Sequence, residues 1–126
     1  MVSTSSAALR SASRRVLVIE DEMMIAMLLE DMLADLGHQV VGVAGRLDVA
    51  LELARDANAD LAILDVDLGG ESSFPVAEVL TSRGLPFLFA TGYGSGGVMQ
   101  PFINTPTLTK PFEMNDLSRA LAKLSI

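Results

Sequence analysis

Short apolar runs alternate along the chain with longer segments in which apolar residues recur at helical spacing. The apolar runs predict strands over 16–19, 38–44, 60–65, 86–90 and 107–109, and the helical spacing predicts helices over 23–36, 47–58, 75–83 and 113–124. Four Gly and one Pro interrupt the stretch 92–105, so a further helix there should be short or frayed. Strands that alternate with helices across short loops predict an α/β fold, in which helices cover both faces of a parallel sheet.

The first predicted helix is rich in Met. Its periodic apolar positions include Ile25, Leu29 and Leu36, and Gly37 ends it. Met is a flexible side chain that fills irregular gaps, so we expect the Met residues here to fill the core, although an exposed groove for a partner is the alternative. These residues are Met23, Met24, Met27 and Met32.

The composition fits one globular domain. A chain of 126 residues, half of them hydrophobic, can bury a core without a structural metal, and it has no Cys for disulfides. No apolar run approaches the roughly 18 residues that cross a bilayer, so we expect no membrane contact and a cytoplasmic location. The segment 1–14 lacks hydrophobic periodicity and predicts a disordered N-terminal tail before a domain over 15–126.

The charge of the chain restricts its partners. The net charge is −7, although the first fifteen residues hold three of the nine basic residues, so the folded part is more acidic still. Direct binding to nucleic acid is therefore not expected, because it requires a basic surface. Proteins, or a cation drawn to an acidic pocket, are the expected partners.

Polar residues follow four of the predicted strands. Glu20 and Asp21 follow the first strand, and Asp65 ends the third. Thr91 follows the fourth strand, and Lys110 follows the fifth. Because ligands gather beyond the carboxyl ends of parallel strands, these side chains should converge on one site.

The acids of this set suit a divalent cation. Mg²⁺ takes about six oxygen ligands, usually from carboxylates, carbonyls, waters and substrate. Asp21 and Asp65 are candidate ligands, Glu20 could act through a water, and the main-chain carbonyl of Asp67 could complete the protein's share. Mn²⁺ is a possible substitute for Mg²⁺ at such a site.

The remaining residues suit phosphoryl transfer. With a cation beside it, the Asp65 carboxylate could attack a phosphoryl donor, since catalysis of such transfers is mostly positioning and electrostatic stabilisation. Lys110 would hold the equatorial oxygens, and Thr91 could donate a hydrogen bond to one of them. The product would be an aspartyl phosphate.

These motifs together resemble the receiver domain of two-component response regulators over 15–126. The resemblance rests on the acidic end of the first strand (16–22), on Leu64-Asp65, on Ala90-Thr91-Gly92 and on Thr109-Lys110-Pro111-Phe112. It implies a doubly wound five-stranded parallel sheet of order 2-1-3-4-5 with helices on both faces, as in flavodoxin-like and receiver-like proteins. The stretch 85–94 is further similar to the FAT GUY subgroup of alphaproteobacteria, named for its Phe-Ala-Thr-Gly motif, in which stand-alone receivers are frequent.

The resemblance also implies a function and roles for single residues. Asp65 would be phosphorylated by a histidine kinase, while Glu20 and Asp21 help to hold Mg²⁺. Thr91 would contact the phosphoryl group and Lys110 would pair with it, with a cis bond between Lys110 and Pro111. The chain would be a single-domain response regulator of a phosphorelay, a switch with phosphotransfer and autodephosphorylation chemistry rather than a dedicated enzyme. Its output would be contact with a downstream protein or a phosphorelay component.

The chain departs from that family at the switch. Receivers usually carry Tyr or Phe three residues before the Lys, where this chain has Thr107. Tyr93, the only Tyr, is a candidate substitute, although it could equally be a simple cover over the pocket. The stretches on either side of Thr91 are a few residues short, so the helices there are expected to be reduced. We hypothesise that phosphorylation draws Thr91 and Lys110 inward and reshapes 92–106.

Three alternatives stay open. A receiver-like binding module could signal without phosphorylation, as the missing aromatic allows. The sequence Asp65-Val66-Asp67 is similar to the aspartyl-nucleophile motif of haloacid-dehalogenase phosphatases, although that motif belongs on a first strand and in a longer chain. A flavodoxin-like flavin binder shares the fold, but the acids after the first strand would repel its phosphate.

Overall fold

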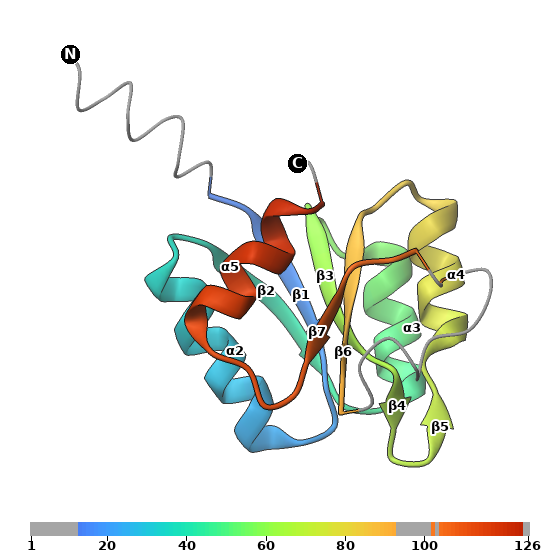
Figure 1. Ribbon diagram of the computed structural model, residues 1–126. Coiled ribbons are helices and arrows are strands. Elements are labelled where there is room, and N and C mark those ends of the chain that lie inside the picture. The colour runs from blue at the N-terminus through green and yellow to red at the C-terminus, as the bar shows by residue number, and fades with distance from the viewer. Residues whose placement is uncertain (1–12, 93–101, 103, 125–126) are drawn as a thin grey trace.

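A computed structural model of the protein describes residues 13–92, 102 and 104–124 (Figure 1). Its main sheet holds five parallel strands, β1 (Arg15–Ile19), β2 (Gln39–Ala44), β3 (Leu61–Asp65), β6 (Phe87–Thr91) and β7 (Thr107–Thr109). The helices within these residues are α2 (Met23–Asp35), α3 (Leu47–Asp56), α4 (Phe74–Ser82) and α5 (Met114–Ala122). The strand order β2-β1-β3-β6-β7 confirms the predicted doubly wound sheet.

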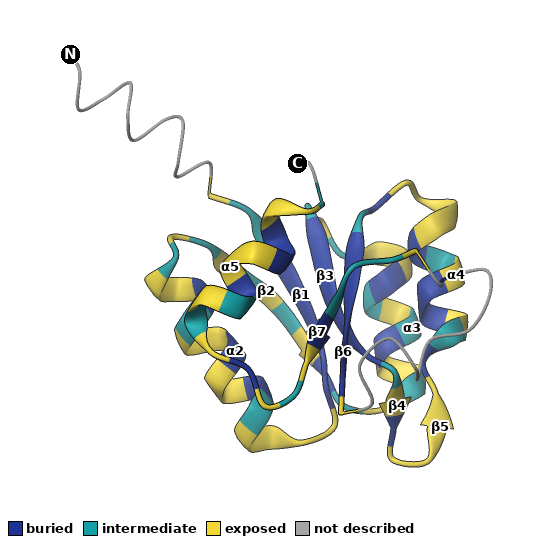
Figure 2. Ribbon diagram, viewed as in Figure 1, coloured by how far each residue is buried: buried dark blue, intermediate teal, exposed yellow. Residues whose placement is uncertain are grey.

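Helices cover both faces of the sheet, α2 and α5 on one face and α3 and α4 on the other (Figure 1). The alternation of side chains along β1 shows how: Val16 and Val18 pack toward α2 and α5, whereas Leu17 and Ile19 pack toward α3 and α4. The strands β1, β3 and β6 are buried, while the outer faces of the helices are exposed (Figure 2). Because both faces of a central parallel strand are buried, its sequence is a continuous apolar run.

A two-stranded hairpin leaves the main sheet directly after β3. It consists of β4 (Asp67–Leu68) and β5 (Glu71–Ser72), which pair antiparallel and which none of the predicted strands includes. Its turn residues Gly69 and Gly70 have φ values of 61° and 94°, which Gly adopts without strain. The other described elements agree with their predicted bounds to within two residues, and most of the stretch 92–105 lies outside the described residues.

The prediction that the Met residues of α2 fill the core is wrong for three of the four. Met23, Met24 and Met27 are 75%, 84% and 57% exposed, and only Met32 packs against the core. The buried face of α2 consists of Ala26, Leu29 and Leu33. The helix is apolar almost all round, so hydrophobic periodicity could not select the face that points inward.

Four Phe side chains pack together on the α3 and α4 face of the sheet. Phe102 lies 5.4 Å from Phe74, 6.1 Å from Phe87 and 5.9 Å from Phe89, measured between ring centroids. Tilted and edge-on arrangements at such distances are the favoured geometry of aromatic pairs. The connection between β6 and β7 is thus anchored in the core at Phe102, which is 7% exposed.

The amino end of the described chain is held against the sheet. Arg14, the last residue of the predicted tail, donates its main-chain N–H to His38 Nδ1 at 3.1 Å, and its carbonyl accepts from Gln39 N–H at 2.9 Å. Residues 1–12 lie outside the described residues. Among the described residues, no helix has the length and apolar character needed to cross a membrane.

Candidate functional site

The predicted site residues meet at the carboxyl edge of the sheet. Glu20 and Asp21 directly follow β1, Asp65 ends β3, Thr91 ends β6, and Lys110 directly follows β7. Three of them are largely buried, with exposed fractions of 3% for Glu20, 7% for Asp65 and 2% for Thr91. The parallel register brings together residues that lie up to 90 positions apart in the sequence, which is the arrangement predicted from the strand ends.

Lys110 lies between two buried carboxylates. Its Nζ lies 3.0 Å from Asp65 Oδ2, to which it donates a hydrogen bond, and 2.9 Å from Glu20 Oε1. Burial disfavours the charged amine, but the interactions with the Glu20 and Asp65 carboxylates outweigh it and raise the pKa of Lys110. Lys110 is therefore a cation fixed beside the carboxylate that the sequence singles out as a nucleophile.

Glu20 is the most perturbed acid of the site. Burial, reinforced by the neighbouring Asp65, raises the pKa of Glu20 to about 7, although Lys110 and the main-chain N–H of Glu22 act in the opposite direction. Its Oε2 accepts a hydrogen bond from that N–H at 3.1 Å. Its Oε1 is buried and accepts no hydrogen bond from any described residue, because Lys110 is close but not in hydrogen-bonding geometry.

These acids fit a divalent cation. One carboxylate oxygen from each of Glu20, Asp21 and Asp65 lies within 4.8 Å of the others. A single amine from Lys110 does not balance three carboxylates, and Glu20 Oε1 is left as a buried acceptor. Hard oxygens in such a cluster are the ligands that Mg²⁺ and Mn²⁺ prefer. The arrangement fits the Mg²⁺ pocket that the resemblance to receiver domains implies.

Main-chain N–H groups hold the two Asp carboxylates. Asp65 Oδ1 accepts from Asp67 N–H at 3.1 Å, and Asp21 Oδ2 accepts from Gly69 N–H at 3.0 Å. The Asp67 side chain is exposed and accepts from Gly70 N–H at 3.3 Å. Sequence reasoning missed Gly69, although Gly-Gly between two short extended runs is a hairpin signal.

The switch residues have different surroundings. Thr91 pairs with Thr109 across β6 and β7, and its carbonyl accepts from Lys110 N–H at 2.9 Å. Thr107 is partly exposed, and its hydroxyl donates to the carbonyl of Thr105 at 3.3 Å. Tyr93 lies outside the described residues. The bond between Lys110 and Pro111 is cis, as the resemblance implied.

The fold and the site define a doubly wound α/β protein with a carboxylate, a hydroxyl and an amine gathered at the carboxyl edge of its sheet. The chain belongs to the response regulator receiver domain family, whose pattern it matches over residues 16–122.

Proteins of that family resemble the chain in sequence and in structure. SdrG from Sphingomonas melonis Fr1 is 46% identical, with a TM-score of 0.83 over 92% of this chain and 99% of SdrG, and a BeF3-activated conformation of SdrG gives a TM-score of 0.76. PhyR from Brucella abortus is 32% identical, with a TM-score of 0.76 over 98% of this chain and 52% of PhyR. The transcriptional regulatory protein PdtaR of Mycobacterium tuberculosis is 34% identical over 86% of this chain and 55% of PdtaR. The chain thus spans about half the length of the curated relatives it matches.

Proposed function

We propose that the protein is a phosphorylation switch in which Asp65 accepts a phosphoryl group from a histidine kinase in a Mg²⁺-dependent reaction. The observation that carries the proposal is the placement of Lys110 Nζ 3.0 Å from Asp65 Oδ2, in a cluster of three carboxylates. Membership of the receiver family supports it, because its motif residues occur here at the expected strand ends.

The residues of the site divide the chemistry among them. An Asp65 oxygen would form a bond to phosphorus as the bond from phosphorus to the donor's imidazole nitrogen breaks, and the electron pair of that bond stays on the imidazole. Lys110 would release part of its ion pairing with Asp65 and contact a phosphoryl oxygen. The Thr91 hydroxyl would donate to another oxygen, because it ends the neighbouring strand.

The cation would be held by Asp21 and Asp65, with Glu20 acting directly or through a water and the carbonyl of Asp67 as a further ligand. When bound, it would neutralise charge that builds up on the phosphoryl oxygens. The buried Oε1 of Glu20 supports this assignment, because it is an acceptor that Lys110 leaves without a hydrogen bond.

We further propose that the chain belongs to the FAT GUY subgroup and that its output is a protein contact. The stretch 85–94 and the likeness to SdrG support the subgroup. SdrG is described in a BeF3-activated conformation, and trifluoroberyllate is a mimic of a phosphoryl group. PhyR from Bartonella quintana is described as an anti-anti-sigma factor, so a relative of this chain acts by binding a protein. The acidic charge of the chain also favours a protein over nucleic acid as the downstream partner.

The position of Asp67 argues against a phosphatase of the haloacid-dehalogenase type. Such an enzyme needs the second Asp as an acid beside its nucleophile. Here the Asp67 side chain turns toward the hairpin and accepts from Gly70 N–H, while only its main-chain N–H contacts Asp65. A binding module that does not use phosphorylation is distinguished by the experiment below.

The test is the intact mass of the protein after incubation with Mg²⁺ and acetyl phosphate or phosphoramidate. Asp65→Asn and a sample with EDTA are the controls. We expect the mass of one added phosphoryl group in the metal-containing wild type alone. If wild type gains no phosphoryl group from either donor or from phosphorylated histidine kinases, the proposal is wrong and a phosphorylation-independent module takes its place.

A further inference from the structure

The β4–β5 hairpin, which follows β3, is closed by main-chain hydrogen bonds. Its strands β4 and β5 pair antiparallel, and Ser73 N–H donates to the carbonyl of Val66 at 2.9 Å, which closes the base. At the tip, both Gly69 and Gly70 have positive φ, as a two-residue hairpin turn requires. The hairpin is therefore a fixed arm whose tip has a defined position.

The tip of this arm contacts a carboxylate that another strand supplies. Gly69 N–H donates to Asp21 Oδ2 at 3.0 Å, although the two residues lie 48 positions apart. The backbone of Asp21 is also closely packed, because a Cβ on Gly45 would lie 3.2 Å from Asp21 Cα. One oxygen of the Asp21 carboxylate is thus fixed by the arm, and the same carboxylate belongs to the cluster with Glu20 and Asp65.

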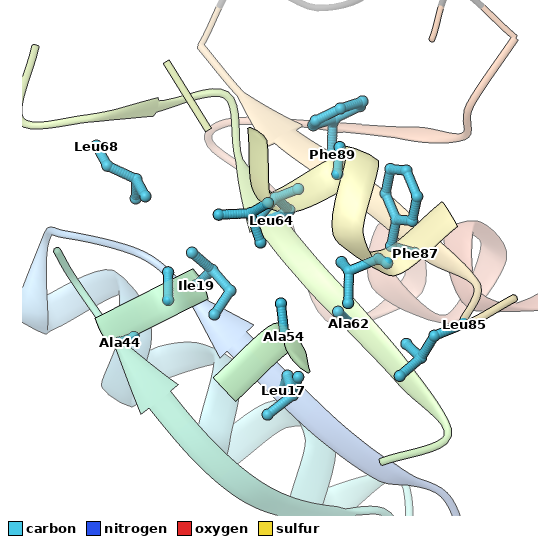
Figure 3. Packing of buried hydrophobic residues seen from close by; sticks show 14 of the residues in the cluster. Leu17, Ile19, Ala44, Ala54, Ala62, Leu64, Leu68, Leu85, Phe87 and Phe89 are labelled. Carbon is cyan, nitrogen blue, oxygen red and sulfur yellow. The ribbon is translucent and has the colours of Figure 1, made fainter. Parts of the chain in front are cut away.

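Leu68 anchors the arm in the core. Its side chain is 3% exposed and belongs to the same apolar cluster as Ile19 and Ala44, which end β1 and β2 (Figure 3). Ile19 directly precedes Glu20 in the chain. The anchor of the arm and the acids of the site therefore rest on the same end of the sheet.

We propose that the β4–β5 hairpin is a positioning arm for the cation site, in which Gly69 N–H orients Asp21 toward the ion and Leu68 holds the arm in place. The inference rests on the proposed function, because it takes the acidic cluster to bind Mg²⁺. Groups that hydrogen-bond to metal ligands from outside typically change metal affinity by about 10–100-fold. Loosening the arm should therefore weaken Mg²⁺ binding while every ligand stays in place.

Leu68→Ala loosens the arm and removes neither a ligand nor the Gly69 N–H. Leu85→Ala is the matched control, because Leu85 is 7% exposed and belongs to the same cluster, but precedes β6 at the opposite edge of the sheet. Mg²⁺ affinity is measured by titration of amide resonances, and Mn²⁺ affinity by electron paramagnetic resonance. We expect affinity to fall about 10-fold in Leu68→Ala and to stay at the wild-type value in Leu85→Ala.

The amide proton of Gly69 gives a second readout, which needs no change in the core. Asp21→Ala removes the acceptor, so the Gly69 amide proton should shift upfield much more than that of Gly70, and it should also respond to Mg²⁺ in the wild type. If wild type binds Mg²⁺ but both Leu variants bind it as tightly as wild type, the arm has no positioning role and the proposed function stands. The same conclusion follows if the Gly69 amide proton shifts neither on Asp21→Ala nor on addition of Mg²⁺. If wild type binds neither Mg²⁺ nor Mn²⁺, the positioning role and the proposed function are both wrong.

Discussion

The charged residues at the two edges of the sheet have different roles. At the carboxyl edge, Lys110 is shared by Glu20 and Asp65 and leaves the carboxylates in excess, which favours binding of a cation. At the amino edge, Arg15 and Asp60 satisfy each other: Arg15 donates to Asp60 from its main-chain N–H at 2.7 Å and from Nη2 at 3.0 Å. The first arrangement is suited to chemistry, and the second fixes β1 beside the start of β3.

The pair at the amino edge makes stability depend on pH. The side-chain and main-chain hydrogen bonds from Arg15 lower the pKa of Asp60 below its ordinary value. A carboxyl with a lower pKa in the folded state stabilises the fold above its ordinary pKa, and this stabilisation is lost as pH falls through the lowered value. Asp60→Asn should therefore lower the melting temperature by about 2–4 °C at pH 7, and the effect should shrink as pH falls below the ordinary pKa of the carboxyl.

Thermal unfolding followed by circular dichroism across this pH range tests the prediction. Asp48→Asn is the control, because the exposed Asp48 carboxylate has only an ion pair with Arg46 at 3.0 Å and a local hydrogen bond from Val49 N–H at 2.9 Å, so its replacement should change the melting temperature little at any pH. An equal loss of stability in Asp60→Asn at pH 7 and at pH 3 would contradict the prediction that the ionised Asp60 carboxylate stabilises the fold through Arg15.

At the scale of elements, the sequence correctly predicted the features that depend on hydrophobic periodicity and on the residues at strand ends. The strands, their parallel arrangement and the convergence of Asp65, Thr91 and Lys110 follow from apolar runs that each end in a polar residue. The β4–β5 hairpin was missed because two-residue strands carry no detectable alternation. The contact between Gly69 and Asp21 could not be predicted, because a main-chain N–H has no side-chain signature.

The orientation of α2 was the other failure, and it leads to a prediction. An exposed Met contributes little to the core, whereas Leu29 is fully buried between α2 and the sheet. Met24→Gln should change the free energy of unfolding by less than about 0.5 kcal/mol, and Leu29→Ala should lower it by about 2–5 kcal/mol. Both values come from chemical denaturation. A loss above about 1 kcal/mol in Met24→Gln would mean that α2 is rotated relative to the described structure.

Across the whole molecule, the excess of acidic residues affects both stability and the proposed function. The chain carries a net charge of −7, and the sheet concentrates Glu20, Asp21 and Asp65 at one edge. Repulsion within such a cluster opposes folding, while an ion that binds only the folded state adds stability in proportion to its occupancy. Lys110 and the cation would thus be alternative sources of positive charge for one site.

Replacement of Lys110 separates these two sources. Lys110→Ala removes the amine between Glu20 and Asp65 and leaves buried acceptors without a partner, so the metal-free protein should lose about 1–3 kcal/mol of unfolding free energy. Mg²⁺ should then stabilise the variant more than it stabilises wild type, because the cation faces less competing positive charge. Calorimetric melting with EDTA and with excess Mg²⁺ measures both effects, and Lys123→Ala, at the end of α5, is the control. Equal stabilisation of wild type and Lys110→Ala by Mg²⁺ would show that amine and cation do not share the three carboxylates.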